Sequence, residues 1–88
     1  MGRVVMLIRV MPVDSEVDLD GLVERIRKEL PAGFKLVSTR REPIGFGMES
    51  LMVGISVPEE EGVTERLEEY LRSVEGVGEV QVEALGRE

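Results

Sequence analysis

The alternation of hydrophobic and polar residues divides the chain into six segments of regular structure. Residues 3–11 are almost all apolar, and residues 49–57 alternate apolar with small or polar side chains, which predicts two strands. Apolar residues recur at helical spacing over 19–30 and over 63–74, which predicts two amphipathic helices. Prolines and glycines separate these segments. The expected elements are strands at residues 3–11, 34–42, 49–57 and 79–85 and helices at residues 19–30 and 63–74.

The order of these elements, strand, helix, strand, strand, helix, strand, is that of the ferredoxin-like split βαβ arrangement. Right-handed crossover connections place both helices on the same face of a four-stranded antiparallel sheet. The predicted fold class is therefore α+β, a ferredoxin-like βαββαβ sandwich with two helices on one face of the sheet. A chain of 88 residues is expected to fold as one domain, which we predict to span residues 1–88.

The second face of the predicted sheet has no helix to cover it. Alternation along residues 3–11 places Arg3, Val5, Leu7 and Arg9 on this face. An uncovered face with apolar residues suits a docking surface, although scattered exposed apolar side chains are ordinary on protein surfaces. The sequence leaves open whether this face binds a partner.

The composition narrows the chemistry that the protein can perform. Cysteine and histidine are both absent, which removes disulfides, thiolate metal sites and the commonest general base. The acidic run Glu59–Glu61 is better explained as a solvated loop, because consecutive loop residues rarely converge on one ion. We therefore expect no metal site, no cofactor and no enzymatic activity.

The net charge of −7 bears on the class of partner. Proteins that bind nucleic acid or an anionic membrane rely on clustered Lys and Arg, so direct binding to either is not expected. A basic protein partner suits an acidic surface better, although acidity also serves solubility alone. No apolar run approaches the length of a membrane span, and the first residues lack a signal-peptide cleavage site. The expected location is the cytoplasm.

A short turn is expected between the second and third strands, at Pro43, Ile44, Gly45, Phe46 and Gly47. It joins two strands and opens no helix, so it is not a phosphate-binding loop. Phe46 is one of only three aromatic residues, and a glycine on each side leaves its ring prominent. Two interpretations of Phe46 remain open. The ring either anchors a protein interface or folds back to cap the core.

With these motifs the chain resembles the family of archaeal elongation factor 1-beta and the C-terminal domain of its eukaryotic counterpart. The resemblance rests on the turn motif Glu42, Pro43, Ile44, Gly45, Phe46 and Gly47, on Met11 and Pro12 after the first strand, on Val17, Asp18 and Leu19 at the start of the helix, and on Glu75, Gly76 and Val77 before Val80, Gln81 and Val82. It covers essentially the whole chain.

The resemblance implies a guanine-nucleotide exchange factor that promotes GDP release and GTP loading on the translation GTPase elongation factor 1-alpha. It implies that Pro43–Gly47 binds this GTPase, with Phe46 in a pocket of the partner. Arg87 stands where eukaryotic members carry a lysine that disturbs the Mg²⁺ and phosphate end of the nucleotide site. Residues 86–88 are expected to lie past the last strand and to be mobile, and the free protein is expected to be a monomer.

One alternative from another class shares the same order of elements. ACT-like modules sense small molecules through glycine-rich turns at a dimer interface. An ACT-like small-molecule-sensing regulatory module is therefore the second functional hypothesis.

Overall fold

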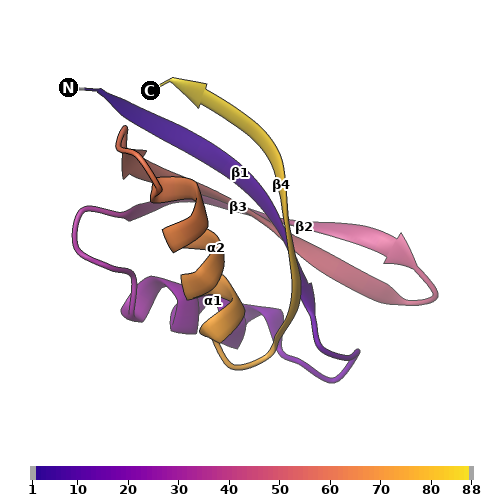
Figure 1. Cartoon of the computed structure of the whole chain (residues 1–88). Coiled ribbons are helices and arrows are strands. Elements are labelled where there is room, and N and C mark those ends of the chain that lie inside the picture. Colours follow the sequence, from indigo (N-terminus) through magenta and orange to yellow (C-terminus); the bar gives the residue numbers. More distant parts are fainter. Residues whose placement is uncertain (1, 88) are drawn as a thin grey trace.

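The computed structural model describes residues 2–87 and contains the six expected elements in the expected order. The strands β2, β3, β1 and β4 lie side by side in that order, and each neighbouring pair is antiparallel. Both helices cover one face of this sheet (Figure 1), so the predicted ferredoxin-like fold is confirmed. The elements are β1 (Arg3–Pro12), α1 (Leu19–Lys28), β2 (Lys35–Gly45), β3 (Met48–Pro58), α2 (Val63–Ser73) and β4 (Val77–Arg87).

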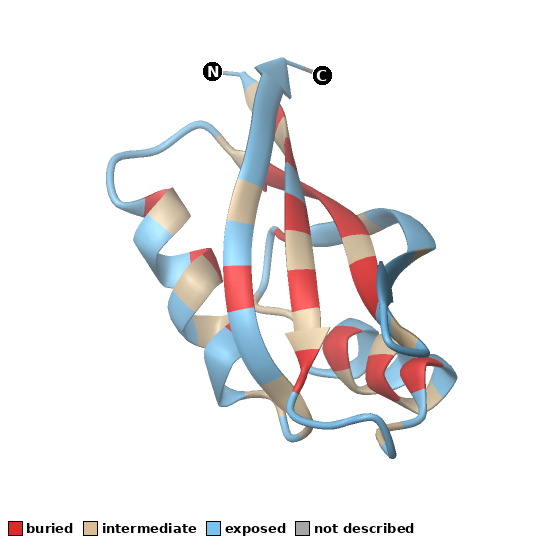
Figure 2. Ribbon diagram, turned by 90° about the vertical axis from the view of Figure 1, so that its right-hand side faces the viewer, coloured by how far each residue is buried: buried red, intermediate tan, exposed pale blue. Residues whose placement is uncertain are grey.

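The core lies between the helices and the two central strands. Every second residue of β1 is buried, beginning at Val4, and the same alternation of period two fills the helix-covered side of β3. Helix α1 begins where the Asp18 carboxylate accepts a hydrogen bond from the backbone N–H of Asp20. Figure 2 shows the buried residues concentrated on these central strands, whereas β4 is mostly exposed.

Tyr70 shows how the two helices are held together. Its ring is half-buried, and its hydroxyl donates a hydrogen bond of 2.6 Å to the carbonyl oxygen of Ile26. This bond joins α2 to the last turn of α1. Leu30, expected inside the first helix, lies just beyond it and packs against the core instead.

All four strands are longer than the sequence predicted, and the ends of β2 and β4 differ most from the expected bounds. The expected turn at Pro43–Gly47 was wrong in part, because β2 continues to Gly45 and only Phe46 and Gly47 form the loop. Pro43 is compatible with β2 because β2 is an edge strand, where every second backbone N–H points away from the neighbouring strand. Gly78, expected to break the chain before the last strand, lies within β4.

The prediction of a mobile tail after the last strand was also wrong for the residues that the structure describes. Gly86 pairs with Val5 and Arg87 pairs with Val4, so both belong to β4. The physical reason is that β1 begins at Arg3 and offers backbone partners up to that point. Glu88, the last residue of the expected tail, lies outside the described residues.

Candidate functional site

The hairpin between β2 and β3 extends beyond the rest of the sheet. The last pair of β1 with β3 joins Val10 to Leu51. Past this point, residues 42–50 pair only with each other within the described chain, and we call them the hairpin arm. Figure 1 shows the arm reaching away from both helices. The fold therefore leaves this segment uncovered by the helices and by the other two strands.

The tip of the arm has an unusual backbone. Gly45, Phe46 and Gly47 have consecutive positive φ angles of 99°, 55° and 75°. A left-handed conformation costs a residue with a Cβ atom about 1–2 kcal/mol, and Phe46 is the one described non-glycine residue that adopts it. A strained residue of this kind persists where the surrounding chain enforces it and is often functional. Here the two flanking glycines supply the conformations that the tight loop needs.

The ring of Phe46 is completely exposed. Its relative exposure is 105%, the highest among the large apolar residues described, and its neighbour Ile44 is exposed as well. The interpretation of Phe46 as a cap on the core is therefore wrong for this structure. A free aromatic ring at the end of a projecting arm contributes nothing to the core, and its shape and position suit an interface anchor.

The base of the arm is held by Arg9, which projects from β1 onto the sheet face without helices. Its Nη1 lies 3.0 Å from the Glu42 carboxylate and donates a hydrogen bond of 2.9 Å to Ser50 Oγ. Its Nε lies 3.4 Å from the Glu83 carboxylate of β4. Glu42 and Ser50 are direct partners across β2 and β3. We call Arg9, Glu42, Ser50 and Glu83 the clasp.

Sequence reasoning missed the clasp, because it treated the uncovered face as open. At each end of this face an arginine of β1 covers a buried serine of β3. Arg3 donates a hydrogen bond of 2.9 Å to Ser56 Oγ, as Arg9 does to Ser50. The available signal was the pair of arginines six residues apart in an apolar strand, matched by two serines six residues apart in another.

On the helix-covered side, Arg41 of β2 donates a hydrogen bond to the carboxylate of Asp20 in α1. This hydrogen bond raises the pKa of the Arg41 guanidinium, which stays charged. Arg41 also lies 3.9 Å from Glu49 on β3. These groups are exposed, so the ion pairs add little stability. Through Glu49, however, Arg41 contacts the arm on the side opposite Arg9.

Arg87 lies at the other end of the sheet. It pairs with Val4, which in turn pairs with Val57 of β3, whereas the arm begins at the opposite end of β3. Its side chain is 83% exposed and lies 3.8 Å from Glu59. The structure thus brings Pro43, Ile44, Gly45, Phe46 and Gly47 together at one tip and sets Arg87 apart, near the chain termini (Figure 1).

The profile of a protein family described as the EF-1 guanine nucleotide exchange domain matches residues 5–87. The chain belongs to this family. The matched range includes both the hairpin arm and Arg87, so both ends of the sheet are parts of the EF-1 exchange domain.

Curated relatives of this exchange domain are similar over nearly their whole length. The protein named elongation factor 1-beta of Staphylothermus marinus is 47% identical, over 99% of this chain and 98% of its own. The elongation factor 1-beta of Hyperthermus butylicus is 44% identical, over 99% and 96%. That of Haloarcula marismortui is 42% identical, over 99% of each chain.

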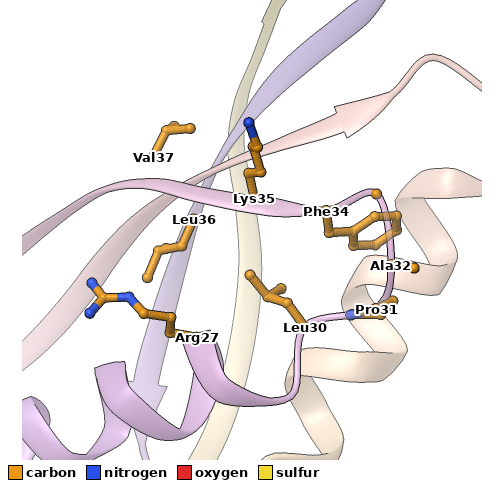
Figure 3. Close-up of a pocket in the computed structure, with 9 residues that line it drawn as sticks. Arg27, Leu30, Pro31, Ala32, Phe34, Lys35, Leu36 and Val37 are labelled. Atoms are coloured by element: carbon orange, nitrogen blue, oxygen red, sulfur yellow. The ribbon is translucent and has the colours of Figure 1, made fainter.

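One hollow on the exchange domain, of about 500 Å³, lies away from the arm, beside the free edge of β2. Figure 3 shows Leu36 and Arg27 on one side of the strand and Lys35 and Val37 pointing to the other. The lining residues therefore do not converge on a single enclosed ligand. The family match also disfavours the hypothesis of an ACT-like sensor of small molecules.

Neither a metal site nor a membrane-spanning helix is found among the described residues. Among residues 2–87, no group of three or more Asp, Glu, His or Cys residues is arranged to hold a metal ion. Neither described helix is long and apolar enough to cross a membrane. Within the described chain, the exposed tip of the arm remains the strongest candidate for a partner-binding site.

Proposed function

We propose that this protein is a guanine-nucleotide exchange factor that binds the GTPase elongation factor 1-alpha and speeds the release of GDP. The observation that carries the proposal is the match of residues 5–87 to the EF-1 guanine nucleotide exchange domain. The exposed ring of Phe46 is the structural observation that supports this proposal, because a projecting aromatic side chain suits a protein interface.

An exchange factor acts by binding alone and is not an enzyme in the chemical sense. It binds the nucleotide-free GTPase more tightly than the GDP-bound form. By thermodynamic linkage, GDP then weakens the binding of the factor by the same ratio. GTP, once bound, displaces the factor in turn. Such a protein needs no metal, cofactor or general base of its own.

The two ends of the sheet are proposed to contact two parts of the GTPase. On β3, Met48 lies in the arm and Val57 lies at the level of Arg87. These two residues are nine positions apart, which corresponds to roughly 30 Å along the strand. In this proposal Phe46, supported by Pro43, Ile44, Gly45 and Gly47, fills a pocket at one end. The guanidinium of Arg87 approaches the phosphate and Mg²⁺ end of the nucleotide site from the other.

We also propose the extent of the domain, its location in the cell, its oligomeric state and the class of its partner. The exchange domain spans residues 1–88, works in the cytoplasm as a monomer when free, and contacts a protein without binding nucleic acid or membrane directly. The net charge of −7 supports a basic protein partner, because opposite surface potentials speed encounter.

The direct experiment measures release of a fluorescent GDP analogue from the cognate elongation factor 1-alpha in excess unlabelled nucleotide. Addition of this protein in catalytic amounts is expected to accelerate release many-fold. Bovine serum albumin at equal concentration serves as the control for non-specific effects. Release at the unstimulated rate, with both proteins shown to be folded, would contradict the proposed function.

A further inference from the structure

The hairpin arm is connected to the rest of the sheet only at its base. Its residues 42–50 form a ladder of two strands only, because β1 stops pairing with β3 at Leu51. An isolated two-stranded hairpin is at best marginally stable in water. The direction in which the tip points therefore depends on what holds the base of the arm.

Arg9 contacts the base at the first cross-strand pair of the arm. Its Nη1 lies within 3.0 Å of both members of this pair, the carboxylate of Glu42 and the hydroxyl of Ser50. Ser50 is fully buried, and the side chains of Arg9 and Glu42 are 21% and 30% exposed. A planar guanidinium with fixed donor directions holds such partners in one geometry, which a flexible ammonium does not.

The outer strand anchors Arg9 from the other side. The register of β4 against β1 shifts between Leu7 and Ile8, which pair with Ala84 and Val82 and leave Glu83 as an extra residue. A bulge of this kind re-aims a side chain, and the Glu83 carboxylate lies 3.4 Å from Arg9 Nε. The clasp therefore connects all four strands at the level where the arm leaves the sheet.

We propose that Arg9 is a positioning residue that fixes the direction of the hairpin arm and so presents Phe46 to the partner. This inference rests on the proposed function. Arg9 pairs with Met52, which follows Phe46 by six residues, a lever of about 20 Å at about 3.3 Å per residue. A rotation of about 10° at the clasp would move the ring by about 3 Å on a lever of that length.

The test combines Arg9→Met with Phe46→Ala in the GDP-release assay. Arg9→Met keeps an unbranched stem, although a shorter side chain, and removes the guanidinium. It is expected to lower exchange efficiency about tenfold in the wild-type background, equivalent to about 1.4 kcal/mol, and less than about twofold when Phe46→Ala is already present. Positions this far apart normally give additive effects, so the loss of additivity reports coupling through the arm.

Controls separate positioning from loss of the fold. Arg27→Met removes one cation from an exposed pair with Glu24 and is expected to leave exchange unchanged. Arg9→Lys keeps the positive charge but loses the planar guanidinium. Its exchange efficiency is expected to lie between those of the wild type and Arg9→Met. If Arg9→Met unfolds the protein, Glu42→Gln weakens the same contact more mildly and is expected to show the same non-additivity with Phe46→Ala.

A measurement on the free protein tests the clasp without the GTPase. Residual dipolar couplings of the Gly45 and Gly47 amides report the direction of the arm relative to the sheet. They are expected to change in Arg9→Met and to stay as in the wild type in Arg27→Met. Unchanged couplings, or an equal loss of exchange with and without Phe46→Ala, would overturn the role of Arg9. Absent GDP release by the wild type would instead overturn the proposed function alone.

Discussion

The helix-covered core and the hairpin arm use apolar residues in opposite ways. In the core, side chains such as Ile8 and Leu67 are fully buried and hold the helices on the sheet. In the arm, Phe46 and Ile44 are exposed and pack against little of the molecule. If the arm binds the GTPase as we propose, stability and partner binding are located in separate parts of this small fold. Substitutions should therefore affect either folding or exchange, and seldom both.

The largest expected effect is on the stability of the core. Ile8→Ala removes a fully buried side chain from the central strand β1 and is expected to cost about 2–5 kcal/mol of unfolding free energy. Chemical denaturation measures this loss directly. Leu7→Ala, on the other face of the same strand, is the matched control and should cost much less, because Leu7 is exposed. Equal losses for both would mean that the core does not lie where the structure places it.

The next effect belongs to the arm. Phe46→Ala is expected to lower exchange efficiency by about 30- to 150-fold, which corresponds to about 2–3 kcal/mol at about 1.4 kcal/mol per tenfold. The melting temperature should barely change, because the ring is fully exposed. Val37→Ala removes another exposed apolar side chain outside the arm and should affect neither quantity. A large fall in melting temperature for Phe46→Ala would return the ring to the core.

The sequence predicted the core well, and the physical reason lies in local periodicity. Val4, Met6, Ile8 and Val10 alternate because one face of a strand is buried, and this signal needs no knowledge of partners. The helices follow from spacing of 3.6 residues in the same way. The turn motif around Phe46 was found as a candidate, but its exposure was left undecided, because either location suits an aromatic between two glycines.

Features that depend on contacts between distant segments were not predictable. The extension of β4 to Arg87 depends on free backbone groups at the start of β1, more than 80 residues earlier in the chain. Arg9 meets Glu42 and Ser50 only through the register of β1, β2 and β3, and it meets Glu83 only through the bulge in β4. Hydrophobic pattern alone contains neither piece of information.

Arg87 is the proposed binding residue at the end of the sheet opposite the arm. Arg87→Ala removes an exposed guanidinium whose nearest carboxylate, on Glu59, lies 3.8 Å away, so the melting temperature should hardly move. Release of GDP should slow roughly five- to tenfold if this charge acts near the phosphates, an effect of about 1 kcal/mol. Arg72→Ala, from an exposed pair with Glu68 on α2, is the control. Full exchange activity of the Arg87 variant would remove this residue from the site.

The smallest expected effect concerns the tip of the arm itself. Gly47→Ala places a Cβ atom at a φ of 75°, where the described residues leave open space but the backbone is strained. We expect a loss of about 1 kcal/mol of stability, which lowers the melting temperature by about 4–8 °C in a domain of this size. Gly86→Ala, in β4 with open space and no positive φ, should leave the melting temperature near that of the wild type. Equal melting temperatures for both variants would contradict the described loop conformation.

Amide hydrogen exchange, measured on the free protein and on its complex with nucleotide-free elongation factor 1-alpha, tests the central claim most directly. The account predicts that protection rises at both ends of the sheet, at residues 44–47 of the arm and at Arg87. Amides of α1 and α2 should be unchanged, because the proposed binding sites lie at the two ends of the sheet and not on the helices. Protection confined to the helices, with the arm as exposed in the complex as in the free protein, would contradict the division between a stabilising core and a binding arm.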